Sequence, residues 1–209
     1  MTEYVSLYRS LIESIDPTIR VARGYTCSSV EDLLGAYALL ACERVVVKPI
    51  HGAAGEGILF LKAVKELSEY TFPMGDVCLE EHLNLDVAPD GVVLSPALHY
   101  NEGELVGEDL VDQIMNGTAY MGWRRTVAPA PFQMRARDIL RRFMDHTQPR
   151  GPGGVDFLSV DGEPYLSDLN TVRLLSSLHA LIIVSLTDLG SGSLQWMPWP
   201  EALPPCPSS

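Results

Sequence analysis

The stretch "GGVDFLSVDGEPYLSDLN", residues 153–170, has the pattern of two short strands that meet at the turn-forming pair Asp161-Gly162. Apolar residues recur along both arms, as expected of a sheet that packs on a core. The arms also carry Asp156, Asp168 and Asn170, which have the oxygen ligands that hard cations prefer. The register of the hairpin decides whether these polar groups meet on one face.

Two registers are compatible with this sequence. If Asp161-Gly162 alone formed the turn, Val155 would oppose Asp168, and both faces would mix acidic with apolar side chains. If residues 161–163 formed a three-residue loop, Asp156 would oppose Asp168, and each face would be uniform. We therefore expect the three-residue loop.

Opposed carboxylates need a neutralising partner. Directly opposite side chains on antiparallel strands have Cβ atoms about 5 Å apart, and like charges there are destabilising. Asn170 would lie on the same face as Asp168, because side chains two residues apart on a strand point the same way. A magnesium ion would satisfy this set, since Mg2+ takes one or two carboxylates and completes its shell with water and phosphate oxygens. The alternative is a solvated acidic face on an edge hairpin, without a ligand.

A glycine-rich segment lies between two other predicted strands. These strands are "RVVVKP" (44–49) and "GILFLK" (57–62), and "IHGAAGE" (50–56) joins them. Glycines allow successive backbone N–H groups to point at an anion, so the loop could cover phosphates, and Lys48 would add a positive charge at its start. The spacing matches neither a P-loop nor a dinucleotide fingerprint, and a hairpin connection without a ligand is the alternative. The glycines are Gly52, Gly55 and Gly57.

The rest of the chain predicts a mixed architecture of helices and strands. Apolar residues at helical spacing predict a helix over 3–14, which ends before Pro17. The capping box Ser28-x-x-Glu31 predicts the start of a second helix. We also predict helices over 62–70 and 138–146 and strands over 76–81 and 91–100, and we interpret the apolar run over 174–186 as a buried helix.

Composition and charge argue against several classes of function. The chain has 209 residues, 46% apolar and 20% charged, so it can bury a core without disulfide or metal support. A formal net charge of −12 argues against binding to nucleic acid or to an anionic membrane surface. The sequence shows no signal-peptide pattern and no CxxC pair, so we expect reduced thiols in a cytoplasmic protein. The cysteines are Cys27, Cys42, Cys78 and Cys206.

Taken together and in this order, three segments resemble the ATP-grasp superfamily of ATP-dependent carboxylate-amine ligases. The segments are "VVVKPIHGAAGEGI" (45–58), "VCLEEHL" (77–83) and "GPGGVDFLSVDGEPYLSDLNTVR" (151–173). The resemblance implies an α+β fold in which two α+β subdomains with antiparallel sheets hold ATP between them. It also implies a ligase that activates a carboxylate as an acyl phosphate for attack by an amine, with ATP and Mg2+, or Mn2+ in its place, as cofactors.

The resemblance further assigns roles to individual residues. Lys48 and the glycine loop would contact the phosphates, the end of the 76–81 strand would line the adenine site, and the hairpin would hold the metal. Arg173 would act together with Lys48 on the transferred phosphoryl group. The nucleotide-binding set is Lys48, His51, Gly52, Ala53, Ala54, Gly55, Gly57, Glu80, Glu81 and Leu83, and the metal-binding set is Asp156, Asp168 and Asn170.

Two departures from the family pattern bear on the expected activity. We expect residues 1–82 to form the smaller subdomain, 83–190 the larger one and 191–209 a proline-rich tail. Family members usually have a separate N-terminal domain and a further lysine upstream, and neither is apparent in this sequence. The carboxylate and amine substrates would be small molecules, and a homodimer or a partner chain could supply the missing domain. The alternative function is a non-catalytic ATP-binding module, or pseudoenzyme fragment, that needs a partner chain.

Overall fold

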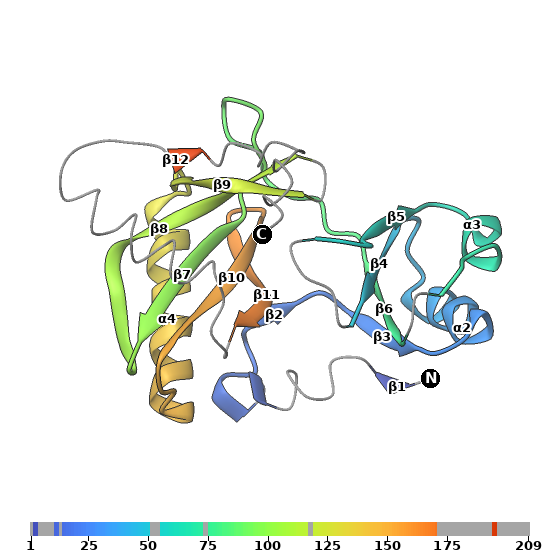
Figure 1. The fold of residues 1–209 in the computed structure, drawn as a ribbon, viewed down its shortest axis with the longest axis horizontal. Coiled ribbons are helices and arrows are strands. Elements are labelled where there is room, and N and C mark those ends of the chain that lie inside the picture. Colours follow the sequence, from blue (N-terminus) through green and yellow to red (C-terminus); the bar gives the residue numbers. More distant parts are fainter. Residues whose placement is uncertain are drawn as a thin grey trace, which may run out of the picture.

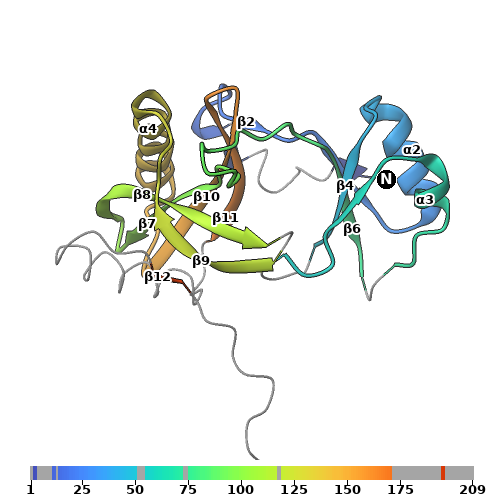
Figure 2. The ribbon, with the colours of Figure 1, turned by 90° about the horizontal axis from the view of Figure 1, so that it is seen from above.

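The computed structural model describes residues 2–3, 11–12, 14–50, 55–72, 75–116, 119–170 and 194–195. They form two lobes, each built on one sheet, with the chain passing between them near the centre of the molecule (Figure 1). The view from above shows the two lobes side by side, with the helices of the smaller lobe on its outer side (Figure 2).

The smaller lobe is a five-stranded sheet with two helices. In sheet order the strands are β1 (Thr2–Glu3), β3 (Gly24–Cys27), β6 (Val77–Glu81), β4 (Val45–Pro49) and β5 (Leu59–Leu61), and the helices are α2 (Val30–Leu40) and α3 (Val64–Ser68). Apolar side chains of α2 and of alternate positions in β3, β4 and β6 form its core. Because side chains alternate along a strand, the residues between these positions point away from α2.

Helix α2 begins one residue later than the sequence predicted. Its N-cap is Ser29, whose hydroxyl oxygen accepts a hydrogen bond from the backbone N–H of Asp32 at 3.1 Å. The carboxylate of Asp32 in turn accepts a hydrogen bond from the backbone N–H of Ser28 at 3.1 Å. The capping pair is therefore shifted by one position from the predicted Ser28-x-x-Glu31, because aspartate in the first turn serves the same purpose as glutamate.

The larger lobe is a seven-stranded sheet with one long helix. In sheet order the strands are β12 (Leu194–Gln195), β9 (Ala119–Arg125), β8 (Glu104–Asn116), β7 (Pro96–Asn101), β10 (Pro152–Val160), β11 (Glu163–Asn170) and β2 (Arg20–Val21). The strand pairs are antiparallel except for β11 with β2. Helix α4 (Ala130–Thr147) packs on one face of this sheet, where its buried side chains join those of β7, β10 and β11 in the main core.

The described chain passes from the larger lobe to the smaller one after β2 and returns after β6. Strand β2 pairs with β11, with Arg20 opposite Tyr165, and Ile12 and Ile19 are buried in the core under α4. Residues 11–21 therefore lie with the larger lobe, although the sequence analysis placed them in the smaller subdomain. Two residues of the expected tail form β12, which pairs with β9.

Several other elements differ from those predicted. Thr2–Glu3 is a strand, although the sequence predicted a helix over 3–14. The strand predicted over 91–100 is regular only from Pro96, and the helix predicted over 138–146 starts earlier, at Ala130. The sequence analysis did not predict β3, β8 or β9. The apolar run over 174–186 lies outside the described residues.

Asp86 fastens the segment that follows β6 to the tip of the β10–β11 hairpin. Its carboxylate accepts hydrogen bonds from the Ser159 hydroxyl at 2.6 Å and from the backbone N–H groups of Asp161 and Gly162 at 3.2 and 2.8 Å. These hydrogen bonds hold the pKa of Asp86 below its ordinary value, with the Ser159 hydroxyl as the largest cause. The charged form of Asp86 therefore stabilises the turn.

We expect Asp86→Ala to lower the free energy of unfolding by about 1–3 kcal/mol, because three donors lose a charged acceptor. Urea denaturation followed by circular dichroism measures this change. The matched control is Glu163→Ala, which removes an exposed carboxylate from the same hairpin. Equal stability of the two variants would show that Asp86 does not hold the turn.

None of the described helices is long and apolar enough to cross a membrane. The cysteines within the described part of the chain, Cys27, Cys42 and Cys78, are free thiols.

Candidate functional site

The hairpin of β10 and β11 brings the predicted carboxylates opposite each other. Asp156 pairs with Asp168, and Gly154 pairs with Asn170. The turn, however, consists of Asp161-Gly162 alone, and both residues adopt a positive φ, 53° and 75°. Positive φ at both central positions is typical of an Asp-Gly hairpin turn. The three-residue loop predicted from the sequence is therefore wrong, although the predicted carboxylate pair is present.

A β-bulge in β11 reconciles the short turn with the carboxylate pair. The register shifts just after Asp156, and Ser167 is the extra residue. Leu166 and Leu169 both lie in the core under α4, although residues three apart on a regular strand point to opposite faces. The bulge therefore sends Asp168 to the face that points away from α4.

Asp156 has two amide neighbours and an unfavourable charge environment. The side-chain Nδ2 of Asn170 donates a hydrogen bond to Oδ2 of Asp156 at 3.0 Å, and the side chain of Gln113 donates a second one. Burial, reinforced by the charge of Asp168, raises the pKa of Asp156 to about 7. Without a cation, the pair therefore holds a proton near neutral pH.

Asp168 lies where the two lobes come together. Its side chain keeps solvent contact but is crowded by protein atoms, and this desolvation raises its pKa. The backbone N–H of Leu169, 2.9 Å away, and the positive charge of Lys48 both oppose that rise. Because Lys48 belongs to β4, the smaller lobe contributes a charge to the carboxylate hairpin.

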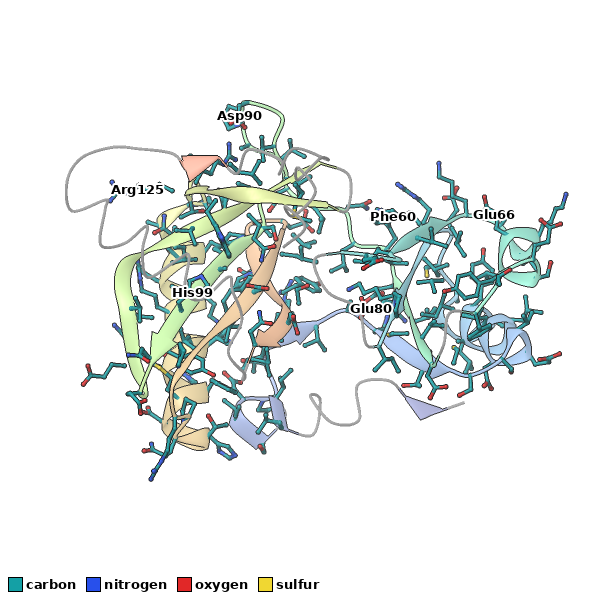
Figure 3. The ribbon with its side chains drawn as sticks, viewed as in Figure 1. Phe60, Glu66, Glu80, Asp90, His99 and Arg125 are labelled. Atoms are coloured by element: carbon teal, nitrogen blue, oxygen red, sulfur yellow. The ribbon has the colours of Figure 1, made fainter. Side chains whose placement is uncertain are left out.

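Lys48 points toward the larger lobe for a reason that is visible in the sequence. Val45 and Val47 are buried against α2, so Lys48 lies on the opposite face of β4. Its ammonium group forms an ion pair with the carboxylate of Glu80 on the adjacent strand β6. Figure 3 shows Glu80 at the side of the smaller lobe that faces the larger one. Two of the predicted nucleotide-binding residues are thus in direct contact.

Only part of the predicted phosphate loop can be compared with the structure. Gly55 and Gly57 have φ values of 81° and 75°, a region that favours glycine. A Cβ atom on Gly57 would also lie 2.7 Å from Cγ of Pro49. His51, Gly52, Ala53 and Ala54 lie outside the described residues, as does Arg173.

The end of β6, where adenine was predicted to bind, lies beside one of the crossings between the lobes. The carboxylate of Glu81 accepts hydrogen bonds from the backbone N–H and the side-chain Nε of Arg23, at 2.9 and 2.8 Å. A cavity of about 330 Å³ opens next to this pair, and Arg20 and Tyr165 are among its lining residues. Leu83 follows in the connecting segment and is partly buried.

The described residues offer two carboxylates and an amide as metal ligands. Within this part of the chain, no three histidine, cysteine, aspartate or glutamate side chains come together. The sequence analysis missed Gln113, which contacts Asp156 from β8. Apolar and polar residues do not alternate in "LVDQI" (110–114), so no local pattern in the sequence marks Gln113.

Several solved structures share this fold at low sequence identity. Biotin carboxylase from Campylobacter jejuni, in complex with β,γ-ATP, has a TM-score of 0.66 at 12% identity over 86% of this chain and 42% of its own. An ADP complex of N5-carboxyaminoimidazole ribonucleotide synthetase has a TM-score of 0.65 at 16% identity over 84% of this chain and 46% of its own. The ATP-grasp ligase PsnB, bound to a precursor peptide and AMPPNP, has a TM-score of 0.55 at 15% identity, with coverages of 88% and 56%.

These similarities establish the fold. The chain has the α+β ATP-grasp fold that its three sequence segments predicted. It spans about half the length of these solved structures. No protein-family model and no curated protein matches the sequence.

Proposed function

We propose that the protein is an ATP-dependent ligase that activates a small carboxylate as an acyl phosphate and joins it to an amine. The observation that supports this most is the position of Lys48, a cation of the smaller sheet whose positive charge opposes the raised pKa of Asp168 in the carboxylate hairpin of the larger sheet. Phosphoryl transfer depends mainly on positioned charges of this kind. Neighbours with the same fold include a synthetase in complex with ADP and an ATP-grasp ligase in complex with AMPPNP.

The proposed reaction has two balanced steps. A carboxylate oxygen of the first substrate attacks the γ-phosphorus of ATP, the bond from that phosphorus to the ADP oxygen breaks, and ADP leaves. The amine nitrogen then attacks the carbonyl carbon of the acyl phosphate, and the carbon–oxygen bond to phosphate breaks. Inorganic phosphate leaves, the nitrogen loses a proton to solvent, and an amide remains.

The predicted nucleotide-binding residues would contact different parts of ATP. Lys48 offsets the negative charge of the phosphates, and backbone N–H groups of the glycine loop bind their oxygens. Arg173 adds a second positive charge near the transferred phosphoryl group. Backbone groups at the end of β6 hold adenine. The phosphate set is Lys48, His51, Gly52, Ala53, Ala54, Gly55, Gly57 and Arg173, and the adenine set is Glu80, Glu81 and Leu83.

The hairpin fits a magnesium ion, with manganese as the alternative. Asp156 and Asp168 face each other, and the pKa of Asp156 is raised. A divalent cation between the two carboxylates would offset their repulsion. Asn170, whose Nδ2 donates to Asp156 in this structure, would turn its amide oxygen toward the cation, and phosphate oxygens would supply further ligands. When bound, Mg2+ supplies positive charge that offsets the negative charge of the transferring phosphoryl group.

A second function rests on chain length. The chain spans about half of the solved structures that it resembles. We therefore keep a non-catalytic ATP-binding module as the alternative, with a partner chain or a second copy supplying the remaining substrate contacts. The free thiols fit a reducing compartment such as the cytoplasm.

Thermal denaturation with ATP and Mg2+ tests both functions. Binding at a ligand concentration of about 100 times Kd stabilises the folded state by about 2.7 kcal/mol, which corresponds to a rise of roughly 5–10 °C in Tm. An unchanged Tm with ATP and Mg2+ would contradict both functions. Magnesium-dependent ADP release with a carboxylate and an amine from a substrate panel supports the ligase, and tight ATP binding without turnover for any pair supports the module.

A further inference from the structure

His99 lies on the same face of the larger sheet as the carboxylate hairpin. Its neighbours in β7, Leu98 and Tyr100, are buried in the core under α4, so His99 points the other way. In β10, Val155 and Phe157 are buried in that core, so Asp156 also points away from α4. Figure 3 shows His99 within the sheet of the larger lobe.

The imidazole of His99 is buried and lacks hydrogen bonds. The residue is only 6% exposed, and neither ring nitrogen has a hydrogen-bond partner among the residues that the structure describes. The ring makes an edge-to-face contact with Trp123, with centroids 5.3 Å apart. Buried polar groups without partners are rare in folded proteins, and each one calls for an explanation. A ligand group is one such explanation.

Gly154 provides the space that the ring occupies. It lies directly opposite His99 in the sheet, and a Cβ atom there would lie 2.8 Å from Nδ1 of the imidazole. Any larger residue would therefore displace the ring. On its other side Gly154 pairs with Asn170, so the imidazole and the Asn170 amide flank a position without a side chain.

The position of His99 relative to the carboxylates follows from the register. Ala97 opposes Asp156 and His99 opposes Gly154, so His99 and Asp156 are diagonal neighbours on adjacent strands. Diagonal neighbours in an antiparallel pair are about 7–8 Å apart. A group held at Asp156 through a cation therefore lies within reach of the imidazole.

The order of residues along β10 indicates which of the bound groups would lie near His99. The hairpin tip is fastened by Asp86 to the segment that follows β6, where the proposed function places adenine. Moving away from that tip, the residues on this face are Leu158, Asp156 and then Gly154 with His99 beside it. Phosphates held at Asp156 would thus have adenine on one side and the phosphoryl acceptor on the other.

The side chains around His99 are apolar and buried. Ala97, Val111 and Trp123 form a buried cluster on this face, and Trp123 is 3% exposed. Burial lowers the pKa of His99 to about 4, so the ring is neutral at physiological pH and offers one donor and one acceptor. An acyl phosphate is destroyed by water, so a dry subsite with one uncharged hydrogen-bonding group suits it.

We propose that His99 binds the reacting carboxyl group of the acyl substrate, and that its imidazole N–H donates a hydrogen bond to an oxygen of the carboxylate and then of the acyl phosphate. This inference rests on the proposed ligase function. His99 is then a substrate-binding residue, and the missing hydrogen-bond partner in the ligand-free protein is the substrate itself.

Acetyl phosphate with MgADP is the probe, because it carries the acyl phosphate group alone. In the reverse reaction its phosphoryl group moves from the acetyl oxygen to the terminal oxygen of ADP, and acetate leaves. The full chain, with nitrogen-15 in its histidine rings, is saturated with MgADP and titrated with acetyl phosphate. We expect the ring nitrogens of His99 to shift, and His99→Phe to slow ATP formation at least about tenfold. The control, His146→Phe, replaces an exposed histidine of α4.

Thermal denaturation separates this inference from the proposed function. His99→Phe removes an unpaired polar group, so we expect a Tm higher by about 2–4 °C without ligand and an unchanged shift with MgADP. A normal MgADP shift with His99 nitrogens that acetyl phosphate does not move would overturn the inference and leave the nucleotide site intact. No MgADP shift in the wild type would overturn the proposed function and this inference together.

Discussion

Asp168→Asn is expected to weaken the binding of ATP in the presence of Mg2+ by about 10- to 100-fold, and to leave the weaker binding of ATP without Mg2+ nearly unchanged. The substitution keeps the shape of the side chain but removes one of the two carboxylates that the hairpin places opposite each other. Mg2+ binds carboxylate oxygens far better than amide oxygens. The loss should therefore appear only in the magnesium-dependent part of the affinity.

Calorimetric titration with and without Mg2+ measures this difference. Glu163→Gln is the matched control, because it neutralises an exposed carboxylate on the same hairpin without touching the pair. We expect the control to bind MgATP as the wild type does. If Asp168→Asn bound MgATP with unchanged affinity, the assignment of the metal to this hairpin would be wrong.

The ligand-free protein is expected to lose stability as the pH rises from about 4 to about 7. The pKa of Asp156 is raised from 3.8 to about 7 in the folded protein, so between these values the folded state keeps a proton that the unfolded chain has released. The free energy of unfolding therefore has this contribution in full below the pKa of the unfolded chain, 3.8, and loses it as the pH rises through the pKa of the folded protein, about 7. The loss is on the order of 2–4 kcal/mol.

Asp156→Asn should remove the part of this pH dependence that comes from Asp156, because the amide carries no charge at any pH in the range. We expect the variant to be more stable than the wild type at pH 8 without ligand and to lose the magnesium-dependent response to ATP. Urea denaturation at pH 5, 6, 7 and 8 measures the slope, and Asp145→Asn, an exposed position on α4, is the control. A wild-type stability that is constant over this range would contradict the raised pKa.

The carboxylate pair of the β10–β11 hairpin could be predicted from the sequence, but the length of its turn could not. The requirement that Asp156 face Asp168 followed from keeping each face uniform, and the structure has that pair. The sequence analysis placed the necessary extra residue in the loop, whereas the structure places it at Ser167 within β11. Both solutions satisfy the same pattern, and only the fit of Leu166 and Leu169 against α4 decides between them.

The strands that the sequence analysis missed have a different cause. Apolar and polar residues do not alternate regularly in strands β8 and β9, and some of their polar side chains contact other parts of the fold. Asp112, for example, is fully buried and accepts hydrogen bonds from the hydroxyl of Thr126 and the backbone N–H of Val127. A buried charge with partners distant in the sequence carries no local signal, so neither strand stood out.

His99 was equally inaccessible to sequence reasoning. A lone histidine in a strand has no motif, and its significance depends on Gly154 and Trp123, which lie on other strands. Lys48 was different, because three preceding valines and the following glycines placed it at a strand end beside a loop. Local patterns therefore identified residues beside a loop and within a single hairpin, and the fold was needed to find those whose neighbours lie on other strands.

The ion pair of Arg23 and Glu81 restricts how the two lobes can move relative to each other. It joins the connection that follows β2 to the one that follows β6. The contacts are those of the Glu81 carboxylate with Arg23 and the backbone N–H of Glu81, which donates to the carbonyl oxygen of Arg23 at 2.9 Å. Beyond it, Asp86 anchors the second crossing to the hairpin tip. Among the described residues, the connecting positions that these contacts leave free to bend are Ala22 on one side and residues 83–85 on the other, because the backbone N–H of His82 donates to the carbonyl oxygen of Arg44 in the smaller lobe. They define a short hinge axis, about which rotation of the smaller lobe would carry Lys48 toward or away from Asp168.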